Sequence, residues 1–150
     1  MNIIYYLIAL SIGIAIAAQS AVNNQLKSLL GGSTFLAALV SFSVGALSLC
    51  LICIVSGERF TQLTQLRNIN PWLLSGGVMG AFFVFGTTLL APRLGVASMI
   101  SLVILGQVVM ALIMDKFGLL GLPIRDILPV RLVGIALVMA GAICVNLGGN

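Results

Sequence analysis

Histidine is absent from this chain of 150 residues, and acidic residues number only three. A hydrolase or transferase needs a nucleophile with a positioned base, or a pair of titratable groups. The three carboxylates, Glu58, Asp115 and Asp126, each stand beside a basic residue, as is typical of ion pairs at helix ends. The sequence therefore predicts a protein that is not an enzyme, and it implies no cofactor.

Charged residues of both signs are scarce as well. They make up 7% of the chain against 61% hydrophobic residues, and the mean hydropathy is +1.25. A soluble domain carries about 25% charged residues because its surface must face water. A chain with so few charges cannot cover itself with polar surface, so we expect its partner to be the lipid bilayer.

Neither nucleic acid nor a metal ion is an expected partner. The seven basic residues are scattered through connectors instead of forming the patch that tracks a phosphate backbone. Cys50, Cys53 and Cys144 all lie within apolar segments, where packing is the favoured interpretation. Cys50 and Cys53 share a helix face, which leaves a metal or redox pair open, but no histidine or membrane carboxylate lies nearby in sequence to complete a site.

Five apolar segments account for most of the chain. About 20 apolar residues cross the hydrocarbon core as a helix, because lipid offers no partner to bare backbone groups. We therefore expect an all-α fold, a polytopic membrane helix bundle with five transmembrane helices in a single domain over residues 1–150. The expected helices cover about 3–22, 34–55, 71–90, 96–114 and 129–147.

Local signals mark several boundaries between these segments. Ser33 or Thr34 can cap the second helix, and Pro71 can open the third because its missing N–H is not needed there. Residues 91–95 are expected to form a tight turn into the fourth helix. The connector 56–70 carries apolar residues between polar ones, which predicts a short helix lying in the membrane interface.

Lysine and arginine in the connectors predict the orientation. Cytoplasmic connectors carry an excess of these residues. One side of the expected bundle holds five of them and the other side two, so the N-terminus is expected inside and the C-terminus outside. The five are Arg59, Arg67, Lys116, Arg125 and Arg131, and the two are Lys27 and Arg93.

Neutral polar side chains inside the apolar segments are the candidate binding residues. Gln107 lies mid-helix and is expected to be buried, because an amide in lipid must find partners. Gln19 and Asn23 are one helical turn apart on the first segment, and Ser41 adds a hydroxyl on the second. Phe85, from a phenylalanine cluster in the third segment, completes the set. A polar cavity that binds a solute and interhelical hydrogen bonding that holds the bundle together both remain open.

Ion coupling has few candidates. A proton-coupled exporter commonly has a carboxylate deep in the membrane, and none is present here. Asp115 and Arg93, at the membrane edge, are the ion-coupling candidates, with Glu58 as another carboxylate in a similar place. Transport driven in a different way is the alternative. A neutral, zwitterionic or weakly anionic solute suits an amide lining better than a cationic drug does.

Five thin helices barely enclose a pathway, which predicts a dimer. Sites at the bilayer midplane are usually gated by two repeats that rock against each other. Because the helix number is odd, two copies in tandem would have opposite orientations. We expect an antiparallel ten-helix pair, formed by a homodimer or with a paralogous partner. A membrane scaffold or accessory subunit that does not transport is the alternative, and a channel is a weaker one.

Several short sequence motifs support this interpretation. They are Ala17 to Asn23, Ala37 to Gly45, Pro71-Trp72, Ala91 to Gly95 and Gly106-Gln107. Together they resemble the YdcZ-like five-helix family of the drug/metabolite transporter superfamily of bacterial inner membranes. The resemblance implies a multi-pass inner-membrane transporter of a small solute, in a family with paired or fused ten-helix members. It implies no particular substrate.

Overall fold

The computed structural model describes residues 3–148, except the side chain of Asn68. It is 86% helical and has no strand among these residues, which confirms the all-α prediction. Five helical segments are long and apolar enough to cross a membrane. The α-helices are α1 (Ile3–Leu29), α2 (Thr34–Val55), α3 (Ser75–Leu94), α4 (Val96–Phe117) and α5 (Pro129–Leu147), and the short 3-10 helices are η1 (Phe60–Asn68), η2 (Pro71–Leu74) and η3 (Leu119–Gly121).

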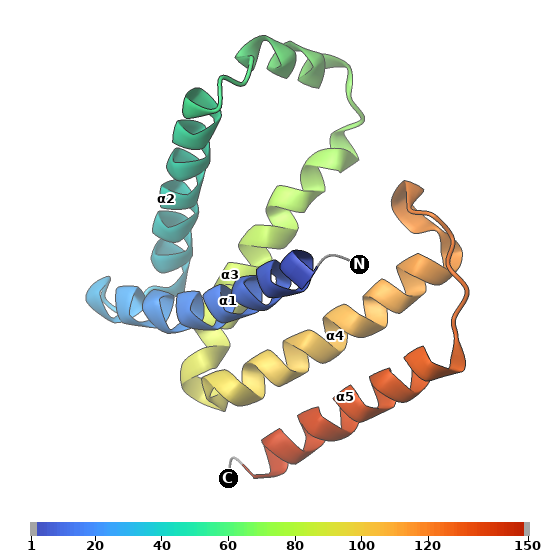
Figure 1. Cartoon of the computed structure of the whole chain (residues 1–150). Coiled ribbons are helices and arrows are strands. Elements are labelled where there is room, and N and C mark those ends of the chain that lie inside the picture. The colour runs from blue at the N-terminus through green and yellow to red at the C-terminus, as the bar shows by residue number, and fades with distance from the viewer. Residues whose placement is uncertain (1–2, 149–150) are drawn as a thin grey trace. The chain divides into compact units, whose positions relative to one another are not determined.

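The chain divides into two compact units, Met1–Pro92 and Arg93–Asn150. The first unit holds α1, α2, the connector with η1 and η2, and most of α3. The second holds α4, α5 and the loop that joins them (Figure 1). A single transmembrane domain over the whole chain stays a prediction.

The first unit begins with a helix that continues past residue 22 to Leu29. The apolar run ends earlier, but a helix needs backbone hydrogen bonds and not apolar side chains, and the polar residues that follow still provide those bonds. After the turn, Ser33 caps α2, and its Oγ accepts a hydrogen bond from the backbone N–H of Leu36 at 3.2 Å. The predicted cap at this boundary is therefore confirmed.

The connector between α2 and α3 is partly helical, as expected. Its central part forms η1, and its placement in the membrane interface stays a prediction. Asn70 then caps η2, accepting a hydrogen bond from the backbone N–H of Trp72 at 3.4 Å, with Pro71 in the first helical position. The α-helical part of this span begins at Ser75.

The tight turn expected over residues 91–95 is wrong. Residues 91–94 still belong to α3, and Pro92 lies inside its last turns. The break falls on Gly95 alone, with φ 79° and ψ 152°. This region of backbone conformation is essentially restricted to glycine, so a single residue without Cβ ends one helix and begins the next.

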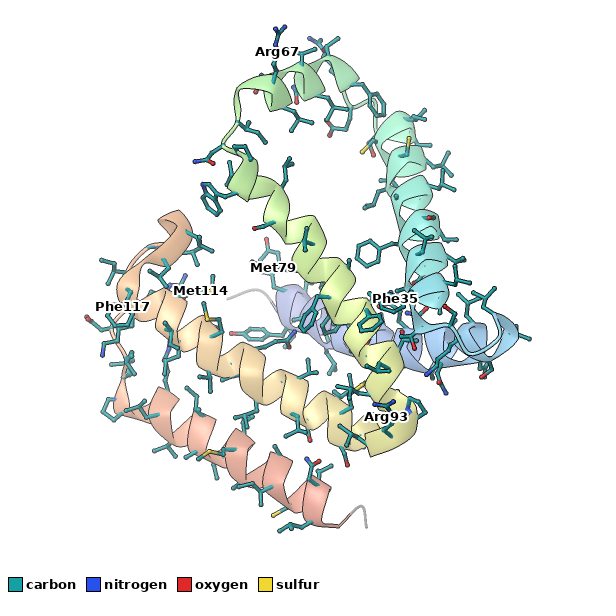
Figure 2. All side chains as sticks on the ribbon, turned by 180° about the vertical axis from the view of Figure 1, so that it is seen from behind. Phe35, Arg67, Met79, Arg93, Met114 and Phe117 are labelled. Carbon is teal, nitrogen blue, oxygen red and sulfur yellow. The ribbon has the colours of Figure 1, made fainter. Side chains whose placement is uncertain are left out.

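Phenylalanine side chains join α2 to α3. The rings of Phe35 and Phe85 stack with their centroids 4.6 Å apart, and Phe35 is labelled in Figure 2. Gly80 gives the ring of Phe42 its space, because a Cβ at residue 80 would lie 3.1 Å from that ring. Contact through such large side chains leaves an open apolar pocket of about 460 Å³ between the two helices. It is lined by Phe35, Ala38, Leu39, Phe42, Val78, Ala81, Phe82 and Phe85.

The second unit is a helical hairpin in which α4 and α5 run side by side in opposite directions (Figure 1). Near one end, Asn146 Nδ2 donates to Ser101 Oγ at 3.1 Å and to the Ala142 carbonyl at 2.8 Å. Near the other, Arg131 Nη1 donates to Asp115 Oδ2 at 3.1 Å. Polar contacts therefore join the two helices at both ends of an otherwise apolar interface.

We expect Gly118→Ala to destabilise this hairpin. Gly118 ends α4 in the left-handed region (φ 57°), and a Cβ there would lie 2.7 Å from Ile124 Cγ1 and 3.1 Å from the Leu122 carbonyl oxygen. The left-handed backbone alone costs about 1–2 kcal/mol, and the clash adds to it. Thermal unfolding of the detergent-solubilised protein measures the loss. The matched control is Gly121→Ala, where φ is 81° but no atom lies within 4 Å. Equal losses of thermal stability in both variants would show that the contact between a Cβ at residue 118 and Ile124 does not contribute.

Candidate functional site

Buried side chains of the first unit are small or polar, which is unusual for a core. The large apolar side chains are mostly at the surface, as expected for helices that face lipid. Polar groups buried in such a setting need partners or serve a ligand. The buried polar residues of this unit are Ser20, Asn23, Thr34, Thr87 and Thr88.

Gln19 and Ser41 line one open pocket of about 270 Å³. Gln19 lies on α1 and Ser41 on α2, and Val84 on α3 contributes to the same wall. The structure thus brings together two of the binding residues predicted from the sequence. The remaining lining residues are Phe42, Gly45, Ala46 and Leu49.

The hydroxyl of Ser41 differs from its neighbours on α2. Ser43 and Ser48 each donate to a backbone carbonyl one turn earlier, at 2.9 Å and 2.8 Å. Within residues 3–148 the structure gives neither the Ser41 hydroxyl nor the Gln19 amide a hydrogen bond. Both groups are therefore open to a ligand in the pocket.

Unlike Gln19, which is exposed, two other polar residues of α1 are buried. Ser20 is 2% exposed and Asn23 is 3% exposed, and Ser20 Oγ and Asn23 Nδ2 have no partner among the described residues. An unpaired buried donor costs about 1–3 kcal/mol. Sequence reasoning selected Asn23 and missed Ser20, although their spacing of three residues places them on one helix face.

Phe85 lies in the neighbouring apolar pocket instead of the one lined by Gln19 and Ser41. It stacks on Phe35, while the preceding residue, Val84, lines the pocket that contains Gln19 and Ser41. Thr87 and Thr88, also missed from the sequence, both donate to the Val84 carbonyl, at 3.2 Å and 2.7 Å. The role of Phe85 in binding stays a prediction.

The expected burial of Gln107 is wrong, because this residue is exposed on α4 of the second unit. A lone amide in an apolar helix shows that a polar contact is needed, but it does not show on which face. Asn146 is instead the amide that joins α4 to α5. The same signal, an amide within an apolar segment, would have found it. A role for Gln107 in binding stays a prediction.

The two ion-coupling candidates lie at opposite ends of α4. Arg93 is exposed in the last turn of α3, just before α4 begins (Figure 2). Asp115 lies in the last turns of α4 and pairs with Arg131. A helix of this length separates them by about 30 Å, so the structure does not bring them together.

Among residues 3–148, no group of three or more histidine, cysteine or acidic side chains could hold a metal ion. Cys50 and Cys144 are exposed free thiols, and Cys53 is a half-buried one. The pocket with Gln19 and Ser41 has no histidine, cysteine or acidic residue in its lining, so its hydrogen-bonding side chains are neutral.

Comparison with known proteins identifies a family. A family model described as "Putative inner membrane exporter, YdcZ" matches residues 4–144. That range contains all the pocket residues, the Asp115–Arg131 pair and nearly all of the five helices. No match was found among curated proteins or solved structures.

Proposed function

Since this chain belongs to the YdcZ family of inner membrane exporters, we propose that it moves a small solute through the pocket between α1, α2 and α3. The family match and the five apolar helices together indicate a multi-pass inner-membrane protein of transporter type. The observation that supports this site is that Gln19 and Ser41, from two helices, line one pocket with no hydrogen bond to the described chain.

The pocket favours a small solute without net positive charge. Its volume of about 270 Å³ lies just below the roughly 300–1,000 Å³ usual for drug-sized ligands. Its polar groups are an amide and a hydroxyl, and no lining side chain is ionisable. A neutral, zwitterionic or weakly anionic solute can be held by such groups, whereas a cation would lack a counter-charge.

We propose that the working unit is an antiparallel pair of ten helices, formed by a second copy or a paralogous partner. The pocket is open, so a single chain does not enclose a solute. Gln107 is exposed on α4 although an amide facing lipid is costly, and a partner chain would supply a hydrogen bond to it. The lysine and arginine count favours the N-terminus inside in the major orientation.

Counterflow in proteoliposomes tests the transport proposal. The vesicles hold an excess of unlabelled solute, and entry of the labelled solute is followed for neutral, zwitterionic, anionic and cationic compounds. Ala46→Phe places a ring in the pocket and should abolish counterflow. Ala136→Phe, at an exposed position on α5, is the control and should not. Absence of counterflow for every compound class would favour the alternative, a membrane scaffold or accessory subunit.

Gln107→Leu separates an assembly role from a binding role. If Gln107 hydrogen-bonds to a partner chain, the substitution should lower dimer affinity about threefold for each amide hydrogen bond that it removes, since such bonds are worth about 0.6 kcal/mol in membranes. Native mass spectrometry of the detergent-solubilised protein measures the dimer fraction. Gln65→Leu, in the connector, is the control. Unchanged dimerisation together with impaired solute binding would instead place Gln107 in the binding site.

A further inference from the structure

The α4–α5 hairpin carries an open groove of about 390 Å³ that the proposed transport site does not use. Small and branched apolar side chains line it, among them Val108 and Ala111 on α4 and Gly134 and Val138 on α5. One end of the groove is formed by Asp115 and Arg131. Along α4, residues 108 to 115 span about 10 Å. The groove is therefore apolar along its length and charged at one end.

The charged end has more cations than carboxylates. Lys116 and Arg125 line a second pocket, of about 460 Å³, together with Asp126. That pocket is tied to the groove, because the backbone N–H of Arg125 donates to the Asp115 carbonyl at 2.9 Å. The two pockets together are lined by three cations, Lys116, Arg125 and Arg131, and two carboxylates, Asp115 and Asp126, which leaves one positive charge in excess.

Arg131 keeps hydrogen-bonding capacity for a ligand. Its bond to Asp115 uses Nη1 only, and its side chain is 42% exposed. A guanidinium has five N–H donors arranged to bind phosphate in a bidentate manner. Lys116 lies over the ring of Phe117, with Nζ 5.4 Å from the centroid. Asp115 and Arg131 lie in the last and first turns of their helices, and the ends of membrane-spanning helices are expected at the level of the lipid headgroups.

We propose that this groove binds an anionic phospholipid. One acyl chain lies between α4 and α5, and the phosphate contacts Arg131 with help from Lys116 and Arg125. Basic pockets between transmembrane helices at the membrane edge recognise anionic headgroups in this way. Charge complementarity favours this occupant over a helix of a second copy, which would fill the groove but leave the excess positive charge unpaired.

Native mass spectrometry of the solubilised chain tests the proposal with phosphatidylglycerol and phosphatidylcholine of equal chain length. The wild type should retain phosphatidylglycerol more tightly. Arg131→Gln and Lys116→Gln should each weaken that binding about fivefold, from roughly 1 kcal/mol per cation near a lipid surface. Arg67→Gln, in the other connector, should leave it unchanged. Lys116→Gln keeps the test valid if Arg131→Gln unfolds the protein, since the Asp115–Arg131 pair remains.

Groove-filling substitutions and competing ligands identify the occupant. The groove-filling pair Ala111→Leu and Gly134→Leu should remove bound phosphatidylglycerol without changing the dimer fraction. If it changes the dimer fraction and not the lipid count, a second copy occupies the groove and the proposal fails. Equal retention of the two lipids, or displacement of phosphatidylglycerol by equimolar inorganic phosphate, would also overturn it.

Discussion

Gln19→Leu is expected to lower solute uptake by about tenfold or more while leaving the protein folded. The amide of Gln19 lines the pocket with Ser41 and makes no hydrogen bond within the described chain. Leucine removes the donor and acceptor and leaves the solute's own polar group unpaired, which costs about 1–3 kcal/mol. Initial counterflow rates in proteoliposomes, at solute concentrations below half-saturation, measure the effect.

Thermal stability separates a binding role from a structural one. Since the Gln19 amide makes no hydrogen bond within the described chain, its removal should not lower the unfolding temperature. Ser48→Ala is the matched control, because its hydroxyl already donates to the Val44 carbonyl and does not line the pocket. A Gln19→Leu variant with normal uptake would remove this residue from the site. A variant that unfolds earlier would assign it to helix packing.

Neutralising Arg59 and Arg67 together is expected to shift membrane orientation from an N-inside majority to a nearly equal mixture. The two residues lie in the connector between α2 and α3, and Arg67 points away from it (Figure 2). Their loss changes the balance of basic residues from five against two to three against two. Because orientation follows lysine and arginine and depends little on acidic residues, Glu58 should not compensate.

Cysteine accessibility measures this shift. A cysteine added at the C-terminus, or Gln65→Cys, is labelled from each side of the membrane after replacement of Cys50, Cys53 and Cys144. Lys27→Gln with Arg93→Gln is the opposite control and should leave a single orientation. If the added cysteine is labelled from both sides in a protein that keeps all seven basic residues, the result supports an antiparallel homodimer. Labelling from one side only would rule out the antiparallel homodimer and leave an oppositely inserted paralogue, a parallel assembly or a role other than transport. No shift in the double arginine variant would refute the predicted orientation.

The sequence predicts the helices better than their ends. Length and apolarity locate the five spans because lipid leaves a bare backbone no alternative to a helix. The end of α1 could not be predicted in the same way, because polar residues up to Leu29 continue the helix. The turn at 91–95 failed for a related reason. Proline suggested a break, but the structure tolerates Pro92 within α3 and breaks at Gly95.

The residue types of the candidate site could be predicted from the sequence, but the direction in which each side chain points could not. Apolar segments make Gln19, Asn23, Ser41 and Gln107 conspicuous, yet a helix built for lipid has little amphipathic pattern to show which side is covered. The structure places Gln19 and Ser41 in one pocket, buries Asn23 and exposes Gln107. The facing depends on packing between helices, which no single segment encodes.

The hydroxyls of Ser43 and Ser48 also affect the insertion of α2 into the membrane. Each uses its donor within its own helix, so neither hydroxyl brings an unpaired donor into the lipid. Ser41 and Gln19 enter the bilayer with their hydrogen-bonding groups open. Placing these unpaired groups in lipid costs free energy during membrane insertion, before any solute is present. Variants that replace Gln19 or Ser41 with an apolar residue are therefore expected to insert more readily than the natural chain.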